Sequence, residues 1–178
     1  NLVEGNSFVK FFADAFHGNA LLSTYYHNHL SDGGVDLWSY HRWFNFIGNV
    51  INSATAYQSL ATDATKRDRF SSVAFRLGYP QQNASNATTN GVAFDPVVWT
   101  SLFRWGNYSV FGNATHFDSA EVPSADPVFP NPVPASQTLP PSFYLTVSLL
   151  VAGGEALEER THEILERMAG QRFIFNLG

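Results

Sequence analysis

The first eight residues, NLVEGNSF (1–8), contain a six-residue pattern that returns twice further along the chain. Residues 3–8, 25–30 and 46–51 all follow the order apolar, any residue, Gly or His, Asn, any residue, apolar. The Asn of the pattern recurs after 22 and then 21 residues. Because a spacing of this size with a turn-forming residue at a fixed place is typical of repeat proteins, the pattern indicates stacked structural units.

The units are expected to be strands, because aromatic and β-branched residues dominate them and turn-forming residues separate them. Neighbouring strands stack about 4.8 Å apart. Asn6, Asn28 and Asn49 would therefore form a ladder of hydrogen bonds at a sharp turn, where Asn tolerates the left-handed conformation. Residues 105–108 contain a weaker fourth copy. These features predict an all-β chain that forms a parallel β-helix, a solenoid of stacked strands.

The repeat also predicts which side chains lie above one another. Two columns are apolar and are expected to point inward; one contains Val3, Tyr25 and Phe46, and the other contains Phe8, Leu30 and Ile51. A further column holds Gly5, His27 and Gly48, so the ring of His27 is expected to have room around it.

Composition excludes several classes of protein. Of the 178 residues, 44% are hydrophobic and 14% are charged, which is too apolar for a disordered chain. The net charge is −5 and no basic run is present, so nucleic-acid binding is not expected. No stretch of 18 apolar residues is present to predict a membrane span. The absence of Cys excludes disulfides and Cys nucleophiles.

Three segments depart from the repeat. We expect a parallel β-helix domain over residues 1–150, from which residues 52–99 project as a long polar arm and residues 119–141 run as a Pro-rich strap along the surface. Within residues 151–178, "EALEERTHEILERMAG" has apolar residues on one helical face and Glu and Arg on the other. This pattern predicts a C-terminal amphipathic helix, followed by a short tail.

The segments "NLVEGN", "FHGNA", "STYYHNHL", "RWFNFIGNVI", "LFRWGNYSV" and "LPPSFYL" resemble the C-terminal half of right-handed parallel β-helix proteins of the pectate-lyase-like superfamily. The resemblance covers about residues 1–146 and implies a right-handed solenoid with surface excursions. It also implies a secreted or extracellular bacterial protein that acts on carbohydrate, although members of this group have diverse activities. Relatives have further coils upstream and end differently, so we expect a truncated or frame-altered fragment.

The residue types most often used in catalysis concentrate between positions 14 and 43. The catalytic candidates are Asp14, Asp36, His27, His41 and Arg42, and the candidates for substrate binding are His17, Trp38, Tyr40 and Trp43. A glycosidase needs two carboxyl groups on either side of the scissile bond, and Asp14 and Asp36 could supply them. A uronate lyase needs a base and a cation, for which His41 or His27 and Arg42 are suited. No metal or other cofactor is predicted.

Three functions therefore remain open. The favoured one is cleavage or binding of a polysaccharide along the flank of the solenoid. The first alternative is a non-catalytic structural or adhesive solenoid, such as a stalk. The second is ester hydrolysis, with Ser7 one repeat away from His29. Unpaired strands at the ends of a solenoid favour pairing, so a homo-oligomer through the ends or the C-terminal helix is expected, with no nucleic-acid or membrane partner.

Overall fold

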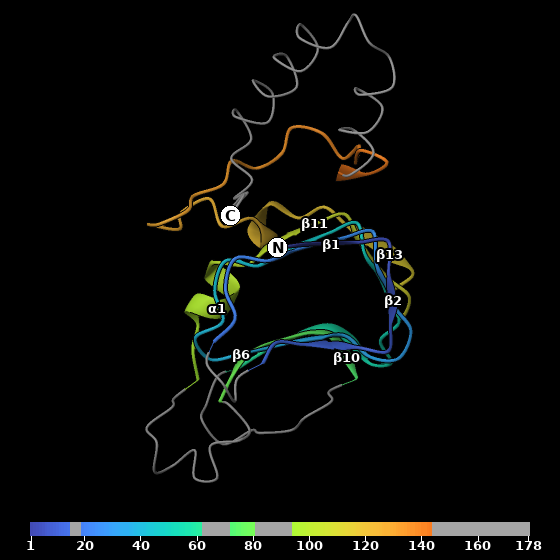
Figure 1. The fold of residues 1–178 in the computed structure, drawn as a ribbon, viewed down its shortest axis with the longest axis horizontal. Coiled ribbons are helices and arrows are strands. Elements are labelled where there is room, and N and C mark those ends of the chain that lie inside the picture. Colours follow the sequence, from blue (N-terminus) through green and yellow to red (C-terminus); the bar gives the residue numbers. More distant parts are fainter. Residues whose placement is uncertain (15–18, 62–71, 81–93, 144–178) are drawn as a thin grey trace, which may run out of the picture.

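The computed structural model describes residues 1–14, 19–61, 72–80 and 94–143, which form three sheets of short strands around a common core (Figure 1). The first sheet has the order β1 (Leu2–Glu4), β4 (Thr24–Tyr26), β7 (Asn45–Ile47), β11 (Phe103–Trp105). The second has the order β2 (Ser7–Phe8), β5 (His29–Leu30), β8 (Val50–Ile51), β12 (Asn107–Ser109), β13 (Ala114–His116). The third has the order β3 (Phe11–Phe12), β6 (Val35–Trp38), β10 (Val73–Tyr79), β9 (Ala56–Leu60).

The repeat sets the register of the first two sheets, as its spacing predicts. The strands pair in parallel, and residues at equivalent positions of the repeat lie beside one another. Both predicted apolar columns are confirmed by these pairings: Val3, Tyr25 and Phe46 in the first sheet, and Phe8, Leu30 and Ile51 in the second.

The predicted Asn ladder is also confirmed, and its fourth member is Asn107. The backbone N–H groups of Asn6 and Asn28 each donate to the Oδ1 atom of the next Asn over 3.0 Å, and Asn49 donates to Asn107 over 3.1 Å. Each buried Asn of the ladder also donates its Nδ2 to a backbone carbonyl of the preceding unit. The ladder thus satisfies the backbone of a turn that lies inside the protein.

The predicted right-handed parallel β-helix is wrong, because the sheets do not close into a solenoid. A solenoid adds one strand to each sheet in chain order, but in the third sheet β10 lies between β6 and β9. In the second sheet β13 pairs with β12 in the antiparallel direction. The order fails because the expected arm, residues 52–99, itself contains β9 and β10. The predicted C-terminal helix in residues 151–178 lies outside the described residues.

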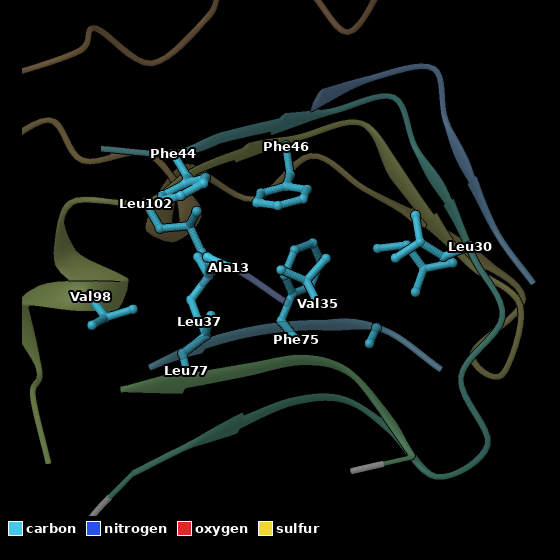
Figure 2. Packing of buried hydrophobic residues seen from close by; sticks show 12 residues of the cluster. Ala13, Leu30, Val35, Leu37, Phe44, Phe46, Phe75, Leu77, Val98 and Leu102 are labelled. Carbon is cyan, nitrogen blue, oxygen red and sulfur yellow. The ribbon is translucent and has the colours of Figure 1, made fainter. Parts of the chain in front are cut away.

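The side between the third and first sheets contains little regular structure. It is occupied by α1 (Val97–Thr100), a single short turn of helix (Figure 1). Val98 of this helix and Leu102 after it are buried in the same cluster as Phe44, Leu37 and Leu77 (Figure 2). Helix and loop residues therefore complete the core where strands are absent. No helix among the described residues is both long and apolar enough to span a membrane.

A second apolar cluster lies on the outer face of the first sheet, beneath the Pro-rich segment. Tyr26, Ile47 and Trp105 pack there with Leu139 and Phe143. Two hydrogen bonds hold the later part of this segment, because the carbonyl of Ser136 accepts from Trp105 Nε1 and that of Pro140 accepts from the Tyr26 hydroxyl. A short 3-10 helix, η1 (Ser119–Glu121), forms the start of the segment. Parts of the Pro-rich segment therefore lie against the outer face of the first sheet.

The predicted glycine column lies at the corner between the first two sheets and is left-handed throughout. The φ angles of Gly5, His27, Gly48 and Gly106 are +69°, +49°, +62° and +68°. His27 is the one member with a side chain, and its ring lies directly over Gly48, where an added Cβ would be 2.5 Å from His27 Cδ2. The space that Gly48 leaves is therefore filled by the His27 ring and by the side chain of Leu139.

We expect Gly48→Ala to destabilise the protein more than Gly5→Ala. Both substitutions force a side chain into the left-handed region, which costs about 1–2 kcal/mol. A Cβ at Gly5 meets no atom within 4 Å, so Gly5→Ala is the matched control. Gly48→Ala adds collisions with His27 and with Leu139, whose Cδ1 would lie 2.8 Å from the new Cβ, so the double variant with His27→Gly should recover part of the difference. Urea denaturation measures this, and equal losses for both alanine variants would contradict the packing described.

Candidate functional site

Two aromatic residues with left-handed backbone follow β6, at positions 40 and 43. Tyr40 has a φ of 71° and Trp43 a φ of 55°. Neither is a residue type that adopts this region easily, and such conformations persist only where surrounding contacts enforce them. The segment from Trp38 to Trp43 is therefore held in a strained conformation by its neighbours.

Asp95 supplies two of the contacts that hold this segment, one to Tyr40 and one to Arg42. Its Oδ2 accepts a hydrogen bond from the backbone N–H of Tyr40 over 2.8 Å and forms an ion pair with Arg42. Its Oδ1 accepts from the backbone N–H of Val97 over 3.1 Å, at the start of α1. One buried carboxylate thus joins the segment after β6 to the short helix.

Tyr40 and Arg42 lie side by side at the surface. The guanidinium of Arg42 is 5.8 Å from the centre of the Tyr40 ring, within the range of a cation–π contact. Arg42 also donates to the carbonyl of His41 over 3.3 Å, and Tyr40 remains 46% exposed. We call Tyr40, Arg42 and Asp95 the Tyr40 site. It presents an exposed tyrosine next to an ion pair.

His41 is buried beneath this surface, and both ring nitrogens are engaged. Nδ1 accepts from the backbone N–H of Trp38, and Nε2 lies 3.1 Å from the carbonyl of Asp14. This arrangement requires the neutral ring with its proton on Nε2. Burial lowers the pKa of His41, an effect that the carbonyl of Asp14 opposes and the charge of Arg42 strengthens. The contacts make His41 a structural link.

The two tryptophans near the site have different environments. Trp38 is buried, and its backbone forms the hydrogen bond to His41. Trp43 is partly buried and makes an edge-to-face contact with Phe129, with ring centres 5.1 Å apart. Its Nε1 is buried and finds no hydrogen-bond partner within the part of the chain that the structure describes. Trp43 therefore contributes packing beside the site.

The remaining predicted residues do not join the Tyr40 site. The carboxylate of Asp36 pairs with Arg76 across neighbouring strands at 2.9 Å. His27 lies at the corner between the first two sheets, where its ring stacks on Tyr26 with centres 3.9 Å apart. Asp14 contacts only His41 of the predicted residues, and it does so through its backbone carbonyl. His17 lies outside the described residues.

The contacts of these residues bear on both predicted reactions. In the glycosidase, Asp14 and Asp36 would be acid and base, but Asp36 is engaged by Arg76. In the lyase, His41 would be the base and Arg42 the cation, but His41 is buried between two backbone groups and Arg42 is paired with Asp95. The structure therefore gives these residues structural partners rather than a shared open groove.

Sequence reasoning missed a second polar cluster, which combines a buried carboxylate, a buried guanidinium and an aromatic ring. Arg104 forms an ion pair with Glu121 at 3.3 Å and donates to Gln58 over 2.9 Å. The hydroxyl of Tyr57 donates to Glu121 over 2.8 Å, and its ring stacks on His116. Burial raises the pKa of Glu121, and the charge of Arg104 opposes this shift. The residues come from distant segments, so spacing could not reveal the cluster.

Sequence reasoning also missed Asp95, although the residue that follows it offers a signal. Asp95 is followed by Pro96, and an acidic residue before Pro is a common way to begin a helical turn.

Ser7 and His29 are register partners, as the repeat implies, and Ser7 Oγ lies 3.5 Å from His29 Nδ1 on an exposed face. Within the described ranges, no group of three or more His, Asp or Glu side chains could hold a metal ion.

Comparison with known proteins adds no relative. No family model matches the chain, and no curated protein or solved structure matches it either. The resemblance to pectate-lyase-like proteins therefore stays a prediction from the sequence, and function has to be argued from the site.

The stability of the protein should fall as the pH is lowered through the range in which His41 titrates. Its pKa in the folded state is lower than the ordinary value of 6.5, so below pH 6.5 the unfolded chain takes up a proton that the folded chain excludes. The stabilisation present above pH 6.5 is then lost at up to about 1.4 kcal/mol per pH unit.

The variant His41→Gln removes the titrating group but can still accept from Trp38 and donate to Asp14. We expect its stability to depend less steeply on pH below 6.5 than that of the wild type. Ser31→Ala, at an exposed residue without an ionisable side chain, is the control and should leave the slope unaltered. Thermal denaturation between pH 5 and 8 gives the comparison, and identical slopes for wild type and His41→Gln would refute the structural role.

Proposed function

We propose that this chain binds an uncharged polysaccharide at the Tyr40 site and does not cleave it. The observation that carries the proposal is the exposed ring of Tyr40 on a left-handed backbone, enforced by a hydrogen bond to Asp95. A left-handed tyrosine costs about 1–2 kcal/mol, and strain of this kind is concentrated at functional sites. An exposed tyrosine that is held in place despite this cost in free energy suggests that its ring contacts a ligand.

The chemistry around the ring suits a sugar. The face of an aromatic ring supplies apolar area, and neighbouring polar groups fix the orientation of a ligand through its hydroxyl groups. Arg42 and Asp95 offer both donors and acceptors beside Tyr40. Their charges balance each other, and this favours an uncharged sugar over a uronate, which would need a cation not already paired.

Binding without cleavage is favoured by the state of the carboxylates. Glycoside hydrolysis needs two carboxyl groups about 5–9 Å apart with freedom to exchange protons. The carboxylate of Asp95 is bound by Arg42 and by two backbone N–H groups, and that of Asp36 is bound by Arg76. Carboxylates that are fixed in this way are better suited to holding a binding surface in place than to catalysis.

The test replaces Tyr40 by glycine and measures binding to cellulose, xylan, chitin and β-glucan. We expect at least a tenfold loss of affinity for the polysaccharide that the wild type binds. Because glycine relieves the left-handed strain, the variant should be no less stable than the wild type. If Tyr40 had only a structural role, its replacement would instead lower the stability of the protein. Phe111→Ala, at a similarly exposed aromatic residue, is the control and should bind normally.

Failure of the wild type to bind any of the four would overturn the proposal and favour the structural or adhesive alternative. Wild-type binding that Tyr40→Gly leaves intact would place the sugar elsewhere and would refute the site.

Ester hydrolysis is a second candidate, favoured by one observation. Ser7 Oγ lies within 3.5 Å of His29 Nδ1, a distance at which a histidine can begin to activate a serine hydroxyl. We expect any hydrolysis of p-nitrophenyl acetate that exceeds the buffer rate to fall at least tenfold in both Ser7→Ala and His29→Gln. Hydrolysis retained in both variants, or none in the wild type, would rule this pair out. Ser31→Ala, at another exposed serine, is the control.

A further inference from the structure

The acceptor motif for N-linked glycans, Asn-x-Ser/Thr, occurs four times in the chain, at Asn83, Asn86, Asn107 and Asn113. A glycan is bulky, so the motif becomes a site only where the side-chain amide of its Asn reaches the surface. Asn83 and Asn86 lie outside the described residues. The other two motifs differ in their surroundings, and the structure separates them.

Asn107 is closed to modification. It is the last member of the Asn ladder and is 0% exposed. Its Oδ1 accepts from the backbone N–H and the side-chain amide of Asn49, and its Nδ2 donates to the carbonyl of Phe46 over 2.7 Å. A sugar on Nδ2 would break the bond to Phe46 and would have to lie inside the protein. Asn107 therefore has a structural role alone.

Asn113 is open to modification. It ends the turn of residues 110–113 that joins β12 to β13, and every residue from 110 to 115 is exposed. Its Oδ1 accepts a hydrogen bond from the hydroxyl of Tyr108 over 2.6 Å, whereas its Nδ2, the atom that carries a glycan, bonds to no residue that the structure describes. Thr115, the third residue of the motif, is exposed on β13. Both side chains that the motif requires are therefore at the surface.

An apolar patch lies beside this turn. Val110 and Phe111 belong to the turn and are 42% and 56% exposed, and Val50 on β8 is 37% exposed. Val50 pairs in register with Tyr108, and successive residues of a strand point to opposite faces, so both lie on the outer face of the second sheet with Val110. We call Val50, Val110 and Phe111 the hairpin patch. Exposed apolar patches of this kind mark places where something binds.

We propose that Asn113 carries an N-linked glycan and that the first sugars of this glycan cover the hairpin patch. The donor is an oligosaccharide attached to a polyprenyl diphosphate. Nδ2 of Asn113 forms a bond to C1 of the first sugar and loses one proton. The bond between C1 and the diphosphate oxygen breaks, and its electron pair leaves with the polyprenyl diphosphate, so nothing is oxidised or reduced.

Composition favours a sugar as the occupant of the patch. Residues 105–115 contain no charged side chain, so this surface offers no counter-charge to an acidic or basic partner. The C–H faces of a sugar pack on apolar and aromatic side chains, and its hydroxyl groups bond to neighbouring polar groups. The covalent link to Asn113 also holds the sugar at a high local concentration beside the patch, so weak contacts are sufficient.

The glycan lies away from the Tyr40 site. The hairpin of β12 and β13 is on the opposite side of the protein from α1, whose first N–H is bound by Asp95 (Figure 1). Modification of Asn113 therefore leaves Tyr40 accessible, and the glycan can be tested separately from polysaccharide binding. A glycan on Asn113 also requires that the chain enters a compartment that contains the lipid-linked donor.

The test expresses the full chain behind a secretion signal in cultured eukaryotic cells and identifies the modified residues by mass spectrometry of glycopeptides. We expect a glycan on Asn113 and none on Asn107. Thr115→Ala removes the motif but keeps the Asn of the turn, so it should abolish the glycan on Asn113. Thr115→Ser keeps the motif and is the matched control, in which Asn113 should still be modified.

The protein is recovered from both the cells and their medium, so the result does not depend on efficient secretion. Unmodified Asn113 in the wild type or in Thr115→Ser would overturn the proposal. A glycan on Asn107, or a glycan on Asn113 in Thr115→Ala, would overturn it as well.

The covering of the hairpin patch is tested by removing the glycan with a peptide N-glycosidase. We expect binding of the dye anilinonaphthalene sulfonate to increase, because this dye binds exposed apolar surface. The increase should be smaller in Val110→Ser with Phe111→Ser, which lacks most of the patch. No increase, or the same increase in both proteins, would show that the glycan does not cover the patch and would refute that part of the proposal.

Discussion

The structure depends on a hydrogen bond that the chain makes three times, from one asparagine turn to the next. The N–H groups of Asn28 and Asn49 are buried at a corner where no strand can pair with them, and each is satisfied by the side chain of the following Asn. A buried N–H without a partner costs about 1–3 kcal/mol. Because each Asn both serves a neighbour and needs one, the ladder fixes the spacing of the units and hence the register of two sheets.

The ladder determines register at one corner only, and this explains how the rest of the architecture departs from a regular solenoid. The third sheet is remote from the ladder, and there the chain inserts β10 between β6 and β9. Its pairing is set by burial of Phe75 and Leu77, which lie in the core together with residues of all three sheets. Apolar burial specifies which face of a strand points inward, but it does not require strands to follow chain order.

The sequence predicts well what depends on local repetition and poorly what depends on distant partners. The columns that include Phe46 and Leu30 follow from a pattern visible within six residues. The strands β9 and β10 were not predicted, because residues 52–99 contain long polar runs that obscure two short apolar segments. The site shows the same division. Tyr40 and Arg42 are visible as a cluster, but the residue that organises them, Asp95, lies more than 50 positions away, and only the fold brings it close.

Asp95 also couples the candidate site to the least regular side of the protein. Its carboxylate binds the segment after β6 and the start of α1, and α1 in turn buries Val98 in the core. A helix of four residues has little stability of its own, since a short helix gains too few hydrogen bonds to offset its ordering. The helix therefore persists through Asp95 and through burial, and the same contacts hold Tyr40 in its strained conformation. Core packing on this side of the molecule thus supplies the free energy that keeps an exposed aromatic ring in position.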